Sequence, residues 1–541
     1  MNYNSFNEVP LKGIDDKLAA GVEPAVFCGE EAMKRIETFR EEASQNQTEK
    51  SILHIVEKNT MNQSNPIHGI EKEVNPLSGN TGIQVCSPMP NDEASEIIQK
   101  MNQEYAVVQI GNQVCILREI QQNGKLSISY LNQESFKLLL ANQKFVPKES
   151  NHSHFVKVAD FWLEHEQRRN YDGIIFDPRS QDPRFYNLWK GFAVEPREGD
   201  CLLYLNHIRE NICSGNQEYF DYLLDWMAHA VQKTYERPET AIVLRGGQGT
   251  GKGVFVKFFG ELFGDHYLQI NQSSHLVGKF NSHLQNRIVL FADEAFWAGD
   301  KQGENVLKGL ITEPNNVIEM KHRDPIQIPN LIHLILASND AWVVPASVDD
   351  RRYLVLDVSD AQKQNTEFFA KIAEQMNHGG REALLHFLQK RDIANVNLRK
   401  IPQTDALLDQ KILSLEPVEQ FWYERLQEGV LHPDYNVWEN PIPSETLYQF
   451  YCAQNQLAGI RRNNWKGEFG KQLRKMCSKL KEQKLTINEY GKNRMNHYSM
   501  PSLDTCRSLF EKYIGMKIQW FSNEEEEEIC SIPDYSNLDD D

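Results

Sequence analysis

A glycine-rich stretch between two apolar runs constrains this chain more than any other feature. Residues 246–253 read GGQGTGKG; they follow the apolar run 241–244 and precede the apolar run 254–259. At such a strand-to-helix turn, backbone N–H groups can cradle phosphates, Lys252 can reach the β- and γ-phosphates, and the helix N-terminus adds positive potential. Gly253 stands where a serine or threonine hydroxyl normally holds Mg²⁺. The stretch is therefore either a chance glycine turn or a nucleotide site that holds its metal in another way. The residues expected to form the cradle are Gly246, Gly247, Gln248, Gly249, Thr250, Gly251, Lys252 and Gly253.

Length and composition are those of a multidomain protein from a reducing compartment. The 541 residues suffice for roughly two to four domains. The nine cysteines are scattered without a CxxC pair, and no signal peptide is visible. This pattern argues against a disulfide framework and against a structural zinc site. No apolar run approaches about 18 residues, so we expect no membrane span.

The net charge of −18 is unevenly distributed along the chain. Nine acidic residues lie within 524–541, and this segment contains no lysine or arginine. A segment of this composition is too polar to bury a core. Half of the net charge therefore belongs to a tail, and the charge does not exclude DNA as a partner.

Changes in composition divide the chain into segments. Residues 12–21 resemble the closing end of the Toprim-like module of mobile-element primases, and an ordinary capped helix start is the alternative. Downstream of residue 236, strand and helix signals alternate as in an α/β fold. The expected organisation is a short N-terminal segment at 1–44 (a possible remnant of such a primase module), a flexible linker at 45–100, an α+β domain at 101–235, an α/β nucleotide-binding domain at 236–400, a helical connector with a compact C-terminal domain at 401–520, and a disordered acidic tail at 521–541.

A second apolar run ends in two acids. Asp293 and Glu294 follow the run 288–292, about 40 residues after Lys252. In this setting Asp293 is expected to hold Mg²⁺ through its water shell, and Glu294 to polarise the attacking water. A strand end with two solvated acids is the alternative, and the phosphate loop upstream weakens it.

Two more polar positions adjoin apolar runs. Asn339 follows the run 331–337 and is suited to sense the γ-phosphate, with a strand-capping Asn as the alternative. Arg351 and Arg352 precede another apolar run. An arginine that reaches a neighbouring subunit's nucleotide would stabilise transition-state charge. A surface arginine pair matched with the two preceding aspartates is the alternative.

A basic turn lies between two short alternating runs at 316–320 and 324–328. The pattern predicts a β-hairpin with Lys321, His322 and Arg323 at its tip. Such a tip suits contacts with a nucleic-acid backbone, because attraction to phosphate needs charge but no reading of sequence. A solvated hairpin without a ligand is the alternative.

The order of these motifs resembles that of the superfamily-three helicases, the AAA+-like hexameric motors of small viruses, phages and plasmids. The likeness covers about residues 200–415 and is greatest to the helicase half of phage and mobile-element primase-helicases. The stretches typical of that subgroup are GKFNSHL at 278–284, ADEAFWAGD at 292–300, LKGLITEP at 307–314, ASNDAWVVP at 337–345 and RRYLVLD at 351–357.

The resemblance implies a ring-forming helicase of the bacterial host cytosol that uses ATP and Mg²⁺ and draws one DNA strand through a central channel. Lys321 and His322 match the family's adjacent Lys and His, which grip single-stranded DNA. Arg351 or Arg352 matches the trans-acting arginine, and the sequence does not say which. Glycine is common in the subgroup at the position of Gly253, so this residue does not mark a dead site.

Basic residues gather between 461 and 494, where eleven Lys and Arg face three Glu. A helix followed by a strand and a turn at Gly491 resembles a winged helix, which would bind duplex DNA. A basic solvated helix that balances the acidic tail is the alternative. The expected buried face consists of Trp465, Phe469, Leu473 and Met476, and the expected DNA-binding residues outside it are Lys471, Arg474 and Lys475.

We therefore expect an α/β protein with an AAA+-like P-loop ATPase core, a helical or mixed N-terminal flank and a winged-helix-like C-terminal domain. Its expected activity is that of an ATP-dependent replicative DNA helicase of a phage or mobile element. Expected partners are single-stranded and forked DNA, further copies in a homo-hexamer, and a primase or replication-initiation protein. The alternatives are the helicase part of a primase-polymerase, an origin-binding assembly ATPase without unwinding, and an RNA-directed motor. Residues 1–235 contain no second acidic catalytic cluster and no zinc-ribbon cysteines.

Overall fold

The computed structural model describes residues 93–122, 125–146, 155–294, 301–321, 324–434, 438, 441–460, 464–486 and 494–520. The chain separates into two units, 1–84 and 85–541, and every element below belongs to the second. The N-terminal segment with its Toprim-like stretch, most of the expected linker and the acidic tail lie outside the described residues.

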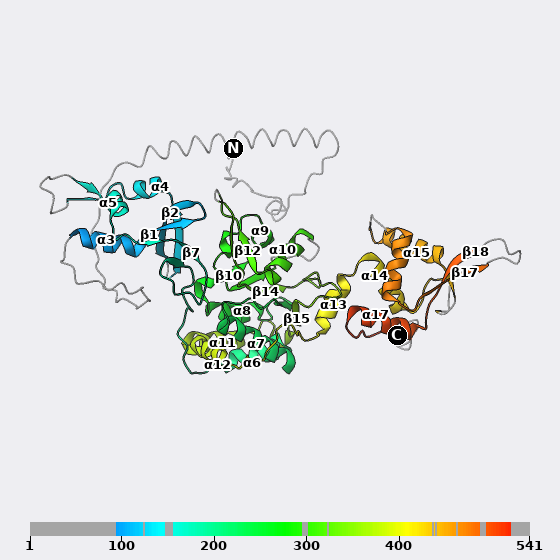
Figure 1. The fold of residues 1–541 in the computed structure, drawn as a ribbon. Helices are drawn as coiled ribbons and strands as arrows, with labels where there is room; N and C mark the ends of the chain where they lie inside the picture. Colours follow the sequence, from blue (N-terminus) through cyan, green and yellow to red (C-terminus); the bar gives the residue numbers. More distant parts are fainter. Residues whose placement is uncertain are drawn as a thin grey trace, which may run out of the picture. The chain divides into compact units, whose positions relative to one another are not determined.

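The first described part is an α+β unit around a four-stranded sheet of order β3-β2-β1-β6 (Figure 1). Its first helix begins at Glu93, inside the segment expected to be a linker. This expectation was wrong at its end because Ile98 and Met101 are buried and give the helix an apolar face. The elements are α3 (Glu93–Glu104), β1 (Tyr105–Ile110), β2 (Gln113–Gln122), β3 (Lys125–Leu131), α4 (Gln133–Leu139), β4 (Lys144–Phe145), β5 (Val156–Lys157), α5 (Val158–Glu164), β6 (Asn170–Tyr171), β7 (Gly173–Ile175) and β8 (Phe185–Asn187).

The central part is built on a five-stranded parallel sheet of order β10-β11-β14-β9-β15. Alternate residues of each strand enter two different cores: Ile242 and Leu244 pack on one face, Ala241 and Val243 on the other. Figure 1 shows α7, α11 and α12 on one side of the sheet and α9 and α10 on the other. Burial on both faces explains why these strands are continuous apolar runs in the sequence.

The elements of the central part are α6 (Leu202–His207), a π-helical turn η1 (Ile208–Ile212), α7 (Gln217–Gln232), β9 (Ala241–Arg245), α8 (Lys252–Glu261), η2 (Gly264–His266), β10 (Tyr267–Ile270), α9 (Ser273–Val277), η3 (Ser282–Leu284), β11 (Val289–Asp293), α10 (Lys301–Thr312), β12 (Asn315–Ile318), β13 (Ile326–Pro329), β14 (His333–Ser338), β15 (Tyr353–Asp357), η4 (Asp360–Gln362), α11 (Thr366–Gln375), η5 (Met376–Gly380), α12 (Arg381–Lys390) and α13 (Asp405–Leu413). The strands and the helix after the glycine-rich stretch lie where the sequence predicts them.

The last described part combines helices with a small antiparallel sheet of order β16-β18-β17. The predicted strand near residue 484 exists, and the expected turn at Gly491 lies outside the described residues. The elements are α14 (Pro417–Glu428), β16 (Ile442–Pro443), α15 (Ser444–Leu457), α16 (Lys466–Met476), β17 (Lys481–Thr486), β18 (Arg494–Ser499) and α17 (Leu503–Ile514).

The predicted buried face of α16 is correct for three residues and wrong for one. Phe469, Leu473 and Met476 are buried, but Trp465 is 71% exposed. Trp465 is the residue that caps α16, so its backbone is extended and its side chain leaves the helical face. Its ring lies over Gly467, where an added Cβ would approach it to 2.1 Å.

Within the described residues, no helix is both long enough and apolar enough to cross a bilayer.

Candidate functional site

The glycine-rich loop that the sequence predicts to bind phosphate, called the phosphate loop below, lies at the carboxyl edge of the parallel sheet. Residues 246–251 connect the end of β9 to the start of α8. Strand register brings the neighbouring strands to an end at the same level: Ser338 of β14 pairs with Arg245, and Asp293 of β11 pairs with Ala337. The carboxyl edge of an open parallel sheet is the place where such folds bind ligands.

Lys252 lies in the middle of this edge, largely buried as the first residue of α8. Its Nζ donates to the carbonyl oxygens of Gly246 and of Gly247, the latter at 2.9 Å, and to Oδ1 of Asn339 at 3.0 Å. Burial lowers the pKa of Lys252, while the charges of Asp293 and Glu294 oppose that shift. The ammonium is thus held in place inside an acidic surrounding.

Asn339 joins Lys252 to the acidic pair. Its Nδ2 donates to Oε1 of Glu294, while its Oδ1 accepts from Lys252. Four residues from three strand ends, which the sequence separates by up to 87 positions, therefore meet at one edge: Lys252, Asp293, Glu294 and Asn339. All four expected catalytic and metal residues of the strand ends are brought together.

The two acids differ in their surroundings. Asp293 is half-buried and accepts from Nε2 of Gln269 at 3.1 Å; burial raises its pKa, and the charge of Glu294 raises it further. Glu294 is exposed and has a left-handed backbone with φ of +53°. That conformation is unfavourable for a residue with a Cβ. Its N–H is fixed by the carbonyl oxygen of Ala337 at 2.9 Å.

Asp293 has the chemistry of a hard-cation ligand, since a carboxylate at a strand end beside a phosphate loop suits Mg²⁺. Among the described residues, no cluster of three or more His, Cys, Asp or Glu suits a metal ion.

The loop needs glycine at one position and leaves another open. Gly251 has φ of +96°, and a Cβ there would lie 2.6 Å from the rings of His207 and Phe369. Gly253 faces open space, with nothing within 4 Å of an added Cβ. Thr250, by contrast, is buried and its hydroxyl donates to the carbonyl oxygen of Gly247 at 3.0 Å.

His207 contacts the phosphate loop, although no sequence pattern predicts this contact. Its Nε2 lies 3.1 Å from the carbonyl oxygen of Gly251, and its Nδ1 lies 3.1 Å from Nδ2 of Asn211. Burial lowers the pKa of His207 to about 4, so the ring is neutral near pH 7. Since the amide of Asn211 donates to Nδ1, Nε2 carries the proton and donates to Gly251. His207 is 44 residues from Gly251 in the chain, and no local motif links them.

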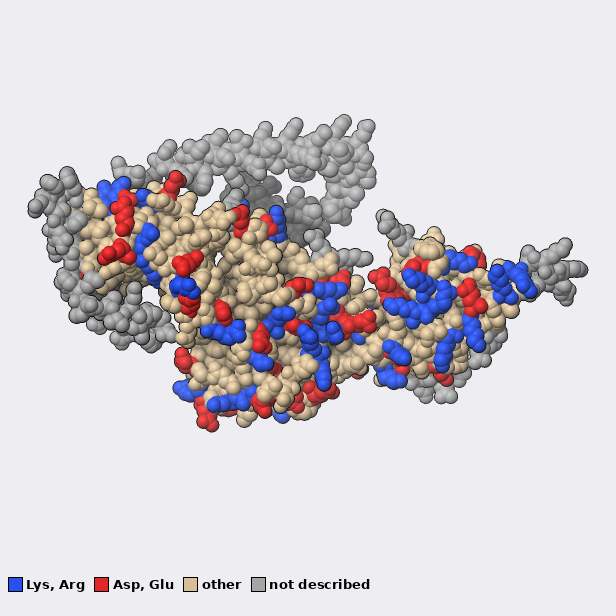
Figure 2. Space-filling model, viewed as in Figure 1, with Lys and Arg blue, Asp and Glu red and all other residues tan. Residues whose placement is uncertain are grey.

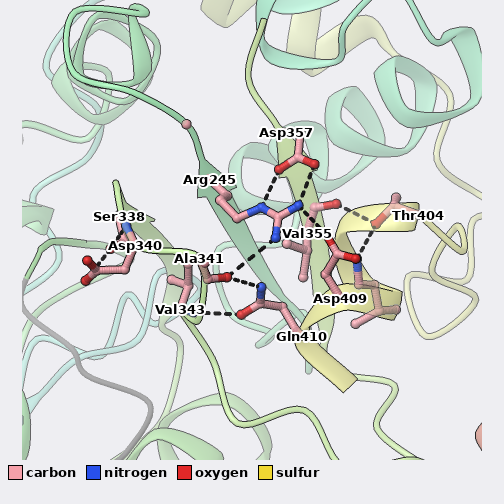
Figure 3. Close-up of polar contacts among 12 residues, drawn as sticks. Arg245, Ser338, Asp340, Ala341, Val343, Val355, Asp357, Thr404, Asp409 and Gln410 are labelled. Carbon is pink, nitrogen blue, oxygen red and sulfur yellow. Dashed lines mark hydrogen bonds and ion pairs between the residues drawn. The ribbon is translucent and has the colours of Figure 1, made fainter. Parts of the chain in front are cut away.

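Arg245 ties the end of β9 to two neighbouring elements (Figure 3). Its guanidinium binds both carboxylate oxygens of Asp357 at 2.5 and 2.7 Å and Oδ2 of Asp409 on α13 at 2.7 Å. These ion pairs raise the pKa of Arg245. Gln410, also on α13, donates to the carbonyl oxygen of Ala341 at 2.7 Å, two residues beyond Asn339. The segment that follows Asn339 and the strand that precedes the glycine-rich loop are therefore both anchored to α13.

The two arginines lie at the opposite edge of the same sheet. Arg351 and Arg352 precede β15, whose first residue, Tyr353, pairs with the first residue of β9. A five-residue strand is about 16 Å long, so this pair does not meet the phosphate loop of its own chain. Arg352 is held by Asp350, with Nη1 to Oδ2 at 2.7 Å. Arg351 is exposed and makes no hydrogen bond or ion pair with any described residue.

A cavity of about 690 Å³ opens beside this arginine pair. Glu239 binds Arg237 at 3.0 Å and also pairs with Arg399, so one carboxylate fixes two further guanidinium groups. Neither arginine was expected from the sequence. The lining residues are Arg237, Glu239, Thr312, Ser347, Asp349, Arg351, Arg352 and Arg399.

The predicted basic hairpin is present. Strands β12 and β13 pair in antiparallel register from Asn315 opposite Pro329 to Ile318 opposite Ile326. Lys321 is exposed at the turn, while His322 and Arg323 lie outside the described residues.

The stretch 278–284 holds the base of this hairpin. Asn281 donates to the carbonyl oxygen of Val317 at 2.9 Å and accepts from the N–H of Glu319 at 2.8 Å. Lys279 pairs with Glu319 at 3.2 Å, and the next residue in the chain, Phe280, is 55% exposed. The stretch that holds the base of the hairpin thus carries a second cation and an exposed aromatic ring, neither of which was predicted as a DNA contact.

The basic residues of the C-terminal part lie on the outside of α16, as predicted. Lys471, Arg474 and Lys475 are exposed, and Arg474 pairs with Glu482 of β17 at 3.0 Å. Lys and Arg side chains also gather at the end of the β17–β18 hairpin (Figure 2). These residues lie far along the chain from the phosphate loop.

Comparisons with known proteins give a fold and one relative. A family model described as a family of unknown function (DUF5906) matches residues 244–352, which include the phosphate loop, the acidic pair, the hairpin and the arginine pair. The DNA primase-polymerase of Nitratiruptor phage NrS-1 is 28% identical over 155 residues, 27% of this chain. That match spans only 21% of the relative's length.

Solved structures agree in fold. The apo structure of the NrS-1 C-terminal region superposes with a TM-score of 0.52 at 16% identity, covering 76% of this chain and 100% of that one. An A-form apo structure of the same region gives a TM-score of 0.53 at 16% identity, covering 75% and 99%. The chain is therefore a mixed α/β protein with a parallel sheet, folded like the C-terminal region of a phage replication protein.

Proposed function

We propose that this chain is the ATP-driven helicase part of a primase-polymerase-type replication protein from a phage or mobile element. The observation that carries the proposal is the meeting of Lys252, Asn339 and Glu294 in one hydrogen-bonded series beside Asp293. An ammonium, an amide and two carboxylates around a glycine-rich loop are the groups that phosphoryl transfer to water requires.

In this proposal the N–H groups of 247–252 bind the phosphates, and Lys252 moves from the loop carbonyls to the β- and γ-phosphates. Asp293 is the residue that would hold Mg²⁺, and the bound ion would supply positive charge beside the phosphate oxygens. Glu294 takes up a proton from the attacking water, and Asn339 keeps Glu294 and Lys252 in register. The exposed position of Glu294 gives a water access to its carboxylate.

The location of the arginine pair supports a site shared between copies. Arg351 does not meet its own loop, yet it is exposed and unpaired among the described residues beside a cavity with three other arginines. A guanidinium in this state suits the phosphates of a nucleotide held by a neighbouring copy, as in a homo-hexameric ring.

DNA is the polymer along which the protein is proposed to move. Lys321 and Lys279 supply charge, and Phe280 supplies a ring on which a base can stack, without need of a particular sequence. The helices and hairpin of residues 417–514 form a winged-helix-like unit, in which Lys471, Arg474 and Lys475 would contact duplex DNA. The NrS-1 relative is named a DNA primase-polymerase. For this chain, primer synthesis is proposed only as the activity of a partner at the same replication fork.

The nucleotide part is tested by ATP turnover of the full chain with and without single-stranded DNA. We expect Mg²⁺-dependent release of phosphate that DNA stimulates and that Lys252→Ala abolishes. Equal turnover by wild type and Lys252→Ala would contradict the proposal. DNA binding without any ATP turnover would support the alternative of an origin-binding assembly factor.

A further inference from the structure

A second lysine lies at the phosphate loop, on a segment that no motif marks. Lys363 follows η4 in the loop between β15 and α11. Its Nζ is 2.9 Å from the position that a Cβ on Gly247 would occupy. Its partner is Asp360, with Nζ to Oδ2 at 3.3 Å; the side chain of Lys363 is 42% exposed and that of Asp360 is 63% exposed.

The loop that carries Lys363 is fastened to the phosphate loop along its length. The N–H of Gln364 donates to the carbonyl oxygen of Gly249 at 2.9 Å, and the N–H of Val358 donates to that of Arg245 at 2.8 Å. Val358 also packs on Gly246, where an added Cβ would lie 3.2 Å from its own Cβ. Residues 358–364 thus follow the backbone of the cradle, and the place of Lys363 is set by that backbone.

The two lysines differ in how their donors are used. The ammonium of Lys252 already donates hydrogen bonds to two carbonyl oxygens and to Asn339. Lys363 has a single described partner, Asp360, and keeps donors for a ligand. Its charge is close enough to lower the pKa of Lys252, whereas the charge of Asp360 raises it.

We propose that Lys363 is a second phosphate-binding residue of this site, which binds the β- or γ-phosphate of the nucleotide from the outer side of the loop. Asp360 holds the ammonium in position and partly neutralises it until a nucleotide binds. This role rests on the proposed function, because it requires that the loop binds a nucleoside polyphosphate.

Two substitutions should change ATP affinity in opposite directions, which separates this role from a structural one. Lys363→Ala removes a cation from the rim and should weaken ATP binding roughly fivefold to tenfold, since the ion pair is partly exposed. Asp360→Asn leaves the lysine unpaired and should tighten ATP binding by roughly twofold to fivefold. Damage to the loop would weaken binding in both variants. Lys363→Arg should restore most of the affinity because it keeps the charge.

The experiment is calorimetric titration of the full chain with ATP, ADP and AMP in the presence of Mg²⁺. Lys371→Ala is the matched control, since Lys371 is exposed, pairs with Glu367 at 2.7 Å and belongs to α11. We expect weaker binding of ATP by Lys363→Ala, with AMP unchanged and no effect in the control; ADP binding weakens as well if Lys363 contacts the β-phosphate and stays unchanged if it contacts the γ-phosphate. Unchanged ATP affinity in Lys363→Ala, or weaker binding in Asp360→Asn, would overturn the role of Lys363 alone. Failure of the wild type to bind ATP or ADP would instead refute the proposed function.

Discussion

Asn339 Oδ1 accepts a hydrogen bond from Nζ of Lys252 at 3.0 Å, which joins the end of one strand to the first residue of the helix after another. The same amide donates to Glu294. One side chain therefore positions both the cation that would bind phosphate and the carboxylate that would activate water.

Replacement of Asn339 by Ala should separate binding from chemistry. Turnover should fall about 100-fold, because Glu294 loses its orientation, whereas ATP affinity should change little. Steady-state kinetics together with nucleotide titration measure the two effects. Asp340→Asn is the matched control, since Asp340 is exposed, adjacent and in contact with Ser338. An equal loss in both variants would mean that the segment, and not the amide, is required.

Substitutions at Asp293 and Gly253 should have opposite outcomes. Asp293→Asn should remove Mg²⁺-dependent turnover, because its carboxylate is the only protein group proposed to hold the ion. Gly253→Ser should keep turnover within about threefold, since a Cβ at this position meets nothing within 4 Å. Phosphate release at several Mg²⁺ concentrations distinguishes them. Loss of activity in Gly253→Ser would show that a hydroxyl at residue 253 interferes with the reaction.

The arginine pair should divide into an acting and a supporting residue. Arg351→Ala should lose turnover and keep its folding stability, because Arg351 has no partner among the described residues. Arg352→Ala should also lose stability, by about 1–3 kcal/mol, because Oδ2 of the buried Asp350 loses its ion pair, while Oδ1 keeps only the backbone N–H of residue 352. Thermal unfolding and turnover measure the difference.

A mixing experiment tests whether Arg351 acts across copies. Subunits with Arg351→Ala and subunits with Glu294→Gln are each inactive in the proposal. When they are mixed, some interfaces combine an intact acidic pair with an intact arginine, so part of the turnover should return. Absence of any recovery in mixed assemblies would place Arg351 outside the neighbour's site.

The positions of the candidate site residues were predictable from the sequence where these residues follow apolar runs. The phosphate loop, the acids after β11 and Asn339 after β14 each stand at the end of an apolar run, and parallel strand register makes those ends meet. The hairpin follows from alternating runs around a basic turn. These features are local patterns combined with one simple rule of sheet geometry.

Contacts between distant segments were not predictable in this way. His207 binds Gly251 across 44 residues, and Lys363 reaches Gly247 from the segment after β15. Trp465 was placed on the buried face of α16 because its spacing fits a helix, yet it caps the helix and is exposed. Periodicity does not show at which residue a helix begins. Here α16 begins at Lys466, one residue after Trp465, so Trp465 does not belong to the buried face.

A buried histidine gives a prediction for pH. His266 accepts from the N–H of Lys190 at 3.0 Å, donates to the carbonyl oxygen of Asn286 at 2.9 Å and stacks on Trp189. Burial lowers its pKa from 6.5 to about 4. The unfolded chain therefore binds the proton more readily, and the stability that His266 contributes is complete above pH 6.5 and is lost as the pH falls from 6.5 to 4.

The variant His266→Gln removes this titration. Wild type should be more stable than the variant at pH 7.5, and that advantage should shrink by about 2 kcal/mol at pH 5. Denaturant midpoints at the two pH values measure the change. A constant difference between wild type and variant would show that His266 has the same pKa in the folded and the unfolded chain.

The central claim is that nucleotide hydrolysis at Lys252 drives movement along DNA through the hairpin of Lys321. Strand displacement on a forked DNA duplex, measured beside ATP turnover in the same reactions, tests it most directly. We predict ATP-dependent displacement by wild type, no displacement and no turnover by Lys252→Ala, and basal turnover without displacement by Lys321→Ala. Displacement by Lys321→Ala at the wild-type rate, or by wild type without ATP, would contradict the account.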